Sequence, residues 1–192
     1  MNQTHKKTRL KKVVFLDRDG VINQDSVQYI KSWSEFKFLA GSLKALKKLK
    51  DHGFATIVIT NQSAVNRKLF TLKVLEDIHT RMQAAIHAAG GHIHDIYFCP
   101  HIPEDNCPCR KPKPKMLFEA RRNHRIDLAS AFMVGDSGKD IECARNAGCG
   151  SAILVQTGNG LSARETLAKK KVVPDHVALD LLDAVDWIVS RS

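Results

Sequence analysis

The sequence predicts an α/β protein in which a mostly parallel central sheet is covered by helices on both faces. Apolar, β-branched segments of strand length alternate with amphipathic segments of helix length along the 192 residues. Most of the strand segments are continuous apolar runs, which is typical of strands buried on both faces. Several of them end in polar turns, and ligands bind at the carboxyl ends of the strands in such sheets.

The first half of the chain contains two predicted strand–helix pairs. The segment "VVFL" at 13–16 reads as a buried strand that ends in the polar turn "DRDG". Residues 41–53 place three leucines at helical spacing and stop at a glycine. Residues 54–60, "FATIVIT", form a second buried strand, and residues 71–91 form an amphipathic helix with a glycine stop.

The second half repeats the alternation. We expect a third strand within 93–99, and a helix within 113–127 that opens with proline. Residues 131–149 read as strand, turn, helix and glycine stop, and 151–158 as a fifth strand. Residues 175–191 predict a short strand followed by a C-terminal helix.

Length and composition favour one domain, at 13–192, preceded by a basic tail at 1–12. No apolar run approaches the roughly 18 residues that a membrane span needs. The apolar stretch Val13–Leu16 is also shorter than the apolar core of a signal peptide, about 7–15 residues. We therefore expect a cytoplasmic protein without a membrane partner. Its five cysteines, an odd number, argue against a disulfide framework.

The formal net charge of +10 suits an anionic partner such as a nucleic acid or a phosphorylated small molecule. The charge is spread along the chain, however, which is typical of solvated surface. Aromatic residues make up only 6% and form no track with basic residues that would suit a nucleic-acid strand. We therefore expect no nucleic-acid partner, and a monomer is the default expectation.

Carboxylates follow two of the predicted strands. Asp17 and Asp19 come after the first strand in "LDRDG", where Gly20 lets the backbone turn. Asp136 ends another strand in "VGDSGKD", and Asp140 follows one turn later. Each motif alone also fits an ordinary turn or a helix N-cap. Three carboxylates at two strand ends can hold one Mg²⁺, which prefers oxygen ligands.

Phosphate-binding groups follow the neighbouring strands. Thr60 and Asn61 end the second strand in "VITNQS", where side-chain and backbone donors can hold a phosphate. Arg110 and Lys111 stand in "RKPKP", although such charges are most often solvated. Together with the carboxylates they suit phosphoryl transfer, which needs positioning and charge neutralisation. A carboxylate can also act as the nucleophile and form an aspartyl-phosphate.

Four motifs in order, "FLDRDG", "VITNQS", "CRKPKP" and "MVGDSGKD", resemble those of the haloacid dehalogenase-like (HAD) phosphatases. The resemblance runs from about residue 13 to residue 155 and implies a Rossmann-like HAD fold. No large insertion separates the motifs, so we expect no large cap domain, with the segment 23–39 forming only a short flap.

The resemblance implies a two-step hydrolysis. Asp17 would attack the phosphorus, and Asp19 would protonate the leaving oxygen and then activate water. Mg²⁺ would be held by Asp17, Asp136 and the backbone carbonyl of Asp19. Thr60 and Lys111 would bind the phosphoryl oxygens, with Asp140 supporting the site from behind.

A second constellation lies within residues 99–109, spaced Cys99-x-His101-x₅-Cys107-x-Cys109. Three thiolates and one imidazole form a closed tetrahedral set for a structural Zn²⁺. A disulfide or unused cysteines in a flexible loop are the alternatives. Because the loop ends in Arg110 and Lys111, we expect the zinc to order this segment and to place the two cations toward the substrate.

This loop before "RKP" resembles the HAD subgroup of the heptose 1,7-bisphosphate 7-phosphatases and the histidinol-phosphate phosphatases. Segments such as "YIKSWSEFKFLAG" favour the heptose enzymes, which would serve lipopolysaccharide-core or other surface-heptose synthesis. Ala64 and Lys68 stand where those enzymes commonly have glycine. The resemblance also suggests contacts with the sugar, from Asn23, Asp25, Tyr29, Gln62, Ser63 and Arg67.

The sequence therefore predicts a Mg²⁺-dependent phosphatase that acts on a phosphorylated sugar, most specifically a heptose 1,7-bisphosphate. A histidinol-phosphate phosphatase and a nucleic-acid 3′-phosphatase are alternatives with the same chemistry. A zinc-stabilised basic module that binds nucleic acid without catalysis is an alternative of another class. The presence of Asp17, Asp19 and Asp136 argues against that module, because it has no need of catalytic carboxylates.

Overall fold

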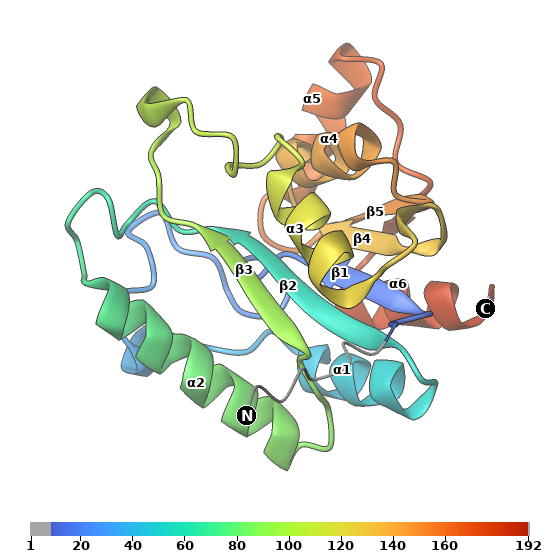
Figure 1. Ribbon diagram of the computed structural model, residues 1–192, viewed down its shortest axis with the longest axis horizontal. Helices are drawn as coiled ribbons and strands as arrows, with labels where there is room; N and C mark the ends of the chain where they lie inside the picture. The colour runs from blue at the N-terminus through green and yellow to red at the C-terminus, as the bar shows by residue number, and fades with distance from the viewer. Residues whose placement is uncertain (1–8, 192) are drawn as a thin grey trace, which may run out of the picture.

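The structure is a computed structural model that describes residues 9–191, so residues 1–8 of the predicted tail lie outside the described residues. Its centre is a six-stranded sheet in which all paired strands are parallel, in the order β3-β2-β1-β4-β5-β6 (Figure 1). The strands are β1 (Val13–Leu16), β2 (Ala55–Asn61), β3 (Asp95–Cys99), β4 (Phe132–Gly135), β5 (Ser151–Val155) and β6 (His176–Ala178). The helices are α1 (Ser42–Asp51), α2 (Leu72–Ala88), α3 (Lys115–His124), α4 (Gly138–Ala147), α5 (Gly160–Lys169) and α6 (Leu181–Val189).

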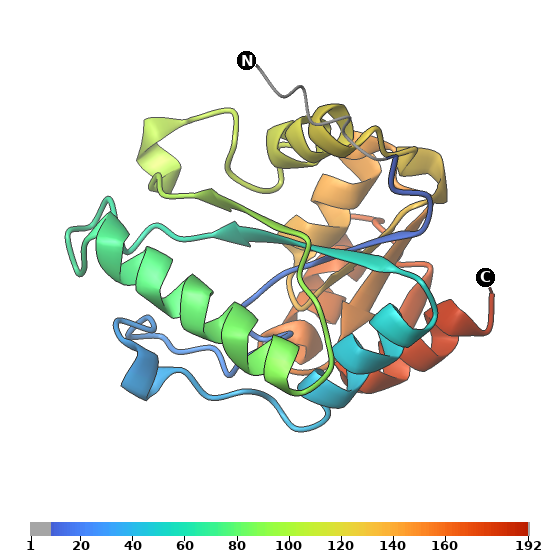
Figure 2. The same ribbon diagram turned by 60° about the horizontal axis from the view of Figure 1, so that its bottom comes forward.

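Helices cover both faces of the sheet, α1, α2 and α6 on one and α3, α4 and α5 on the other (Figure 2). Successive side chains of a strand point to opposite faces, so each strand contributes to two cores. In β1, Val14 and Leu16 pack in one cluster, whereas Val13 and Phe15 pack in the other. This double burial explains why β1 is apolar at every position, and it confirms the predicted fold class.

One helix was absent from the expectations. Helix α5 follows β5, in a stretch where the sequence carries no strong apolar stripe. Its buried positions are Gly160, Ala163 and Leu167, so its contact with the sheet is made largely by small residues. A weak hydrophobic pattern of this kind gives little signal for a helix.

The strand order places the functional residues. The chain builds outward from β1 to β3 on one side and from β4 to β6 on the other, so the order reverses between β1 and β4. Ligands bind at the carboxyl ends of the strands at such a switch point. The motifs that carry Asp17 and Asp136 end these two strands.

The connection from β1 to α1 is a short flap, and no large cap is inserted among the described residues. The flap contains a single helical turn at Trp33–Glu35, and its aromatic side chains pack on one another. Trp33 stacks on Phe36 with the ring centroids 5.0 Å apart, and Phe38 meets Phe36 edge-on. In residues 9–191, no helix has both the length and the apolar character needed to cross a membrane.

Candidate active site

Three carboxylates meet beyond the carboxyl ends of β1 and β4. Asp17 follows β1, Asp136 follows β4, and Asp140 lies in the first turn of α4, with one oxygen of each within 4.8 Å of the others. Ser137 begins α4 and anchors Asp140, since its backbone N and its Oγ both donate to Asp140 Oδ2, at 3.0 and 2.6 Å. Asp136 and Asp140 are buried, so the start of α4 both caps the helix and contributes two carboxylates to this buried group.

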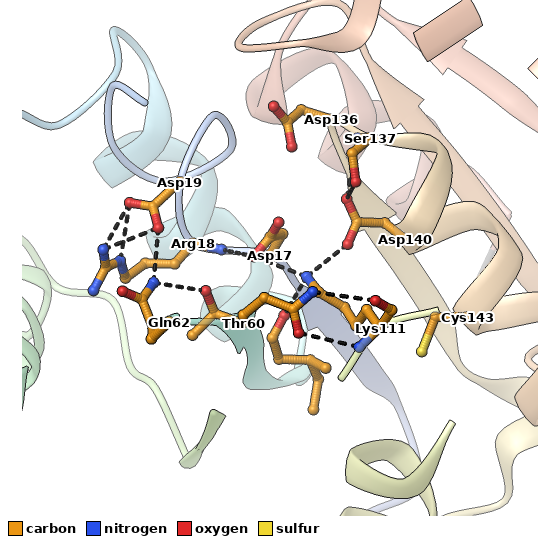
Figure 3. Close-up of polar contacts among 12 residues, drawn as sticks. Asp17, Arg18, Asp19, Thr60, Gln62, Lys111, Asp136, Ser137, Asp140 and Cys143 are labelled. Atoms are coloured by element: carbon orange, nitrogen blue, oxygen red, sulfur yellow. Dashed lines mark hydrogen bonds and ion pairs between the residues drawn. The ribbon is translucent and has the colours of Figure 1, made fainter. Parts of the chain in front are cut away.

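Lys111 forms ion pairs with two of these carboxylates, those of Asp17 and Asp140 (Figure 3). Its Nζ lies 2.9 Å from Asp17 Oδ1 and 2.6 Å from Asp140 Oδ1, and it also donates to the carbonyl oxygen of Ile59 at 2.7 Å. Asn61 holds the backbone of Lys111, accepting from its N at 3.1 Å and donating to its O. Lys111, which the sequence predicts to bind phosphate, is thus fixed beside Asp17.

Asp19 lies in a separate network. Arg18 donates to both of its carboxylate oxygens, with Nη2 at 2.7 Å from Oδ1 and 2.9 Å from Oδ2. Asn23 and Gln62 donate to the same carboxylate at 2.9 and 2.7 Å. Burial disfavours the charged form, but the charge of Arg18 and these hydrogen bonds outweigh it and lower the pKa of Asp19. This carboxylate is therefore ionised and held in one orientation.

The electrostatics of the three-carboxylate group favour a bound cation. Burial raises the pKa of Asp17 well above its usual value despite Lys111, and Asp140 and Asp136 raise it further. Burial and the charge of Asp140 raise the pKa of Asp136 to about 7. Lys111 alone does not balance three acidic groups, whereas a divalent ion with oxygen ligands would. The residues present therefore fit Mg²⁺.

The loop between β5 and α5 confines Asp136, and sequence analysis did not identify it. A side chain at Gly20 or Gly158 would place its Cβ 2.2 Å from Asp136 Oδ2, and both glycines have positive φ angles. Asn159 donates to the same oxygen from its backbone N at 2.8 Å and from Nδ2 at 3.1 Å. Asn159 Nδ2 also reaches Asp25 Oδ2 of the flap at 3.0 Å, so one residue joins the flap to the carboxylate group.

Asp17, Asp19 and Asp136 line an open cleft of about 440 Å³, whereas Asp140 is not among its lining residues. The predicted site residues that line it are Asp17, Asp19, Asp25, Tyr29, Thr60, Asn61, Gln62, Ser63, Arg110, Lys111 and Asp136. Arg67 is exposed and does not line this cleft, and Asn23 is buried beneath Asp19. Lys68 has a φ of 59°, in the left-handed region that favours glycine.

The second constellation forms a compact cluster beyond the end of β3. The sulfur atoms of Cys99, Cys107 and Cys109 lie 3.3–3.5 Å apart, and His101 Nδ1 lies 3.3 Å from Cys109 Sγ. These separations exclude a disulfide, whose sulfurs are about 2.05 Å apart. They approach the roughly 3.8 Å between sulfurs around a tetrahedral zinc ion. Cys143 and Cys149 are buried elsewhere in the core, as expected of packing thiols.

The cluster reaches the active site through Arg110. The guanidinium of Arg110 donates from Nη1 to the carbonyl oxygen of His101 at 3.0 Å, and the side chain lines the cleft. Lys111, in contrast, is held by Asp17, Asp140 and the backbone of β2. The loop therefore orients Arg110 directly, whereas Lys111 has anchors of its own.

Replacing Cys107 with serine is expected to lower both stability and substrate affinity. Loss of one thiolate weakens a closed four-ligand site, and the loop then no longer fixes Arg110. For the predicted zinc site, we expect the zinc content to fall, the thermal midpoint to drop, and KM to rise about tenfold, as for one lost charge-assisted contact. Zinc content, thermal unfolding and steady-state kinetics measure the three effects. Cys149→Ser, a buried thiol outside the cluster, is the control; a stable, zinc-free and fully active Cys107→Ser variant would contradict the prediction.

Comparisons with known proteins agree with this site. A family model described as HAD-hydrolase-like matches residues 108–184. The D-glycero-β-D-manno-heptose-1,7-bisphosphate 7-phosphatase of Bordetella bronchiseptica is 45% identical over 158 residues, 82% of this chain and 86% of the relative. The enzyme of the same name from Neisseria meningitidis is 38% identical over 184 residues, 94% of this chain and 96% of the relative.

A solved structure is similar over nearly the whole chain. The D,D-heptose 1,7-bisphosphate phosphatase from B. bronchiseptica, crystallised with magnesium and phosphate, superimposes with a TM-score of 0.87 at 41% identity. The match covers 94% of this chain and 99% of the other.

The family-model match and the relatives identify the parallel sheet, with acidic groups at its switch point and a buried lysine beside them, as that of a haloacid dehalogenase-like hydrolase. The relatives narrow the class to the phosphatases. This chain belongs to the D-glycero-D-manno-heptose-1,7-bisphosphate 7-phosphatase family.

Proposed function

We propose that the protein removes the 7-phosphate of D-glycero-β-D-manno-heptose 1,7-bisphosphate through a phosphorylated Asp17. The names of the relatives support the substrate. The geometry of Asp17 carries the mechanism. Its Oδ1 is engaged by the backbone N of Arg18 at 2.7 Å and by Lys111 Nζ at 2.9 Å. Its Oδ2 makes no hydrogen bond with the described residues, and this oxygen is the one available for attack on phosphorus.

Each step has a residue to perform it. Lys111 neutralises the phosphoryl oxygens next to Asp17, and the Thr60 hydroxyl orients them by hydrogen bonding. In the first step Asp19, at the edge of the same cleft, takes up a proton from the incoming monoprotonated phosphate monoester and passes it to the leaving oxygen of the sugar. In the second step the Asp19 carboxylate accepts a proton from the water that cleaves the aspartyl-phosphate. Arg110, at the wall of the cleft, binds a more distant anionic group of the substrate.

Asp17, Asp136 and the backbone carbonyl of Asp19 would hold Mg²⁺. The ion supplies positive charge that stabilises the negative oxygens of the transferring phosphoryl group. Asp140 supports this set from behind through Ser137 and Lys111. We propose zinc as the ion of the Cys99, His101, Cys107 and Cys109 cluster, where four protein ligands leave no open position for substrate.

Phosphate release from a panel of substrates tests the proposal. With Mg²⁺ present, we expect the highest kcat/KM for the β anomer of heptose 1,7-bisphosphate, and a lower value for the α anomer. Histidinol phosphate, fructose 1,6-bisphosphate and a 3′-phosphorylated oligonucleotide should be poor substrates. A preference for histidinol phosphate would retain the mechanism and overturn the substrate. No release from any compound by folded, metal-loaded protein would overturn the proposed activity.

Without Mg²⁺ the stability of the folded protein should fall as the pH rises, and added Mg²⁺ should counteract this fall. The pKa of Asp136 rises from the usual 3.8 to about 7 in the folded state, so between these values the folded protein binds more protons than the unfolded chain. Without added Mg²⁺, stability should therefore fall as the pH rises through this window and stay low above it. Mg²⁺ binds the ionised carboxylates and should restore stability at high pH.

Thermal unfolding at pH 5 and pH 8, with and without Mg²⁺, measures this dependence at roughly the two ends of the window. Asp136→Asn should flatten the dependence and remove most of the stabilisation by Mg²⁺. Asp77→Asn, on the exposed face of α2, is the matched control. Equal stability of the Mg²⁺-free wild type at the two pH values would contradict the prediction.

A further inference from the structure

A buried chain of contacts runs from helix α2 to the Asp19 carboxylate, through residues that the proposed mechanism does not use. Arg18 stands between Asp17 and Asp19, yet its side chain is only 1% exposed. Its guanidinium donates twice to Asp19 through Nη2 and once through Nε, at 3.2 Å. The remaining group, Nη1, lies 3.3 Å from Nε2 of His79. His79 belongs to α2 and is 61 residues away along the chain.

The direction of the last contact follows from its chemistry. Arginine has donors and no acceptor, so Arg18 Nη1 must donate and His79 Nε2 must accept. Burial and the nearby charge of Arg18 lower the pKa of His79 to about 3, which keeps the ring neutral. Its proton then lies on Nδ1, and Nε2 has the lone pair that the guanidinium needs.

His79 is itself held in place. It is 7% exposed, and its ring meets that of Phe98 on β3 edge-on, with the centroids 5.9 Å apart. The ring centroid of Phe36 in the flap lies 6.0 Å from the guanidinium carbon of Arg18. The guanidinium is therefore close to both the flap and α2. The hydrogen bond from Arg18 Nη1 to His79 Nε2 is more than a packing contact, because it fixes the orientation of the guanidinium.

We infer that His79 is a positioning residue for the acid–base step, because it orients Arg18 and, through Arg18, the carboxylate of Asp19. This inference rests on the proposed function, in which Asp19 transfers the protons. In Figure 3 the Asp19 carboxylate points toward Arg18 and Gln62, whereas Asp140 points toward Lys111. The two carboxylates thus belong to different supporting groups. Loss of His79 should disturb proton transfer and leave the attack by Asp17 intact.

Substrates with two different leaving groups distinguish the proton transfer by Asp19 from the attack by Asp17. A sugar phosphate needs a proton on its leaving oxygen, so its hydrolysis depends on Asp19. In 2,4-dinitrophenyl phosphate the leaving group departs without a proton, so the first burst of dinitrophenolate depends on Asp17 and on phosphate binding. Asp19→Asn supplies the reference pattern, namely a retained burst with slow turnover of the sugar phosphate.

His79→Leu should reproduce part of this pattern. We expect kcat for the sugar phosphate to fall about 10- to 100-fold, as for a misplaced catalytic group. The burst rate with the aryl phosphate should stay within about twofold of wild type, since a leaving group that needs no proton makes no demand on Asp19. His79→Gln, whose side-chain oxygen can accept from Arg18, should recover most of the lost rate. His87→Leu, an exposed histidine on the same helix, should behave as wild type.

The burst amplitude counts folded, competent molecules, so a loss of fold is distinguished from a loss of positioning. Equal losses in the burst rate and in sugar-phosphate turnover would assign His79 a purely structural role and overturn the inference. Unchanged kinetics in His79→Leu would also overturn it. A wild-type protein with neither a burst nor turnover would instead overturn the proposed function, and the inference with it.

Discussion

Replacing Asp17 with asparagine is expected to abolish phosphate release while leaving the protein at least as stable as wild type. Asparagine cannot form the aspartyl-phosphate, so kcat should fall by at least on the order of 10³, as for other lost nucleophiles. Stability should not fall, because burial raises the pKa of Asp17 and the folded protein bears the cost of its charge. The amide also leaves Lys111 with a second carboxylate, that of Asp140.

Steady-state kinetics and thermal unfolding in buffer without added Mg²⁺ provide the two measurements. A further readout is the phosphoenzyme, which rapid acid quenching should trap in the wild type and not in Asp17→Asn. Asp51→Asn, at an exposed position at the end of α1, is the control for the loss of one negative charge. Retained turnover in Asp17→Asn would exclude Asp17 as the nucleophile, and a strongly destabilised variant would contradict the electrostatic argument.

Replacing Lys111 with methionine should have the largest effect on stability of any substitution in the cleft. Methionine keeps an unbranched chain of similar length but leaves Asp17 and Asp140 without their buried cation. Removal of one partner from a buried ion pair costs about 3–5 kcal/mol, mostly because the remaining charge is uncompensated. Turnover should also be lost, since Lys111 neutralises the phosphoryl oxygens in the proposed mechanism.

Urea unfolding with and without Mg²⁺ measures this loss. The double variant Lys111→Met/Asp140→Asn should recover part of the stability without recovering activity, because it removes one of the unpaired carboxylates. Lys115→Met, four residues further on and exposed, is the matched control. A stability within about 1 kcal/mol of wild type would mean that the pair contributes no more than a surface ion pair.

Much of the active site was predictable because its groups are encoded locally. The proposed nucleophile Asp17 and the proposed acid–base residue Asp19 share one pentapeptide, and the cysteine–histidine cluster spans only 99–109. The apolar strands that precede these motifs are equally local signals, and parallel strands bring their carboxyl ends to one edge of the sheet. The predicted gathering of Asp17, Thr60, Lys111 and Asp136 around one cleft is confirmed by the structure.

The supporting residues were not predictable from their local sequence. Arg18 looks like a surface charge in "DRDG", and His79 looks like a polar position on an amphipathic helix. Asn159 lies in a loop after β5 that carries no motif, and helix α5 follows it without a strong pattern. In the structure Arg18 binds its neighbour Asp19, but His79 reaches Arg18 from 61 residues away and Asn159 reaches Asp136 from 23 residues away.

The sequence by itself determined the fold class, the edge of the sheet at which the candidate site lies, and the side chains proposed to react and to bind metal. Only the tertiary structure decided which strands are neighbours, that Lys111 is shared by Asp17 and Asp140, and that α2 reaches Asp19 through Arg18. The physical reason is the separation along the chain over which each feature is determined. Strand patterns, turns and ligand spacings are set by residues close together in the chain, whereas a buried charge takes its orientation from whichever elements pack against it.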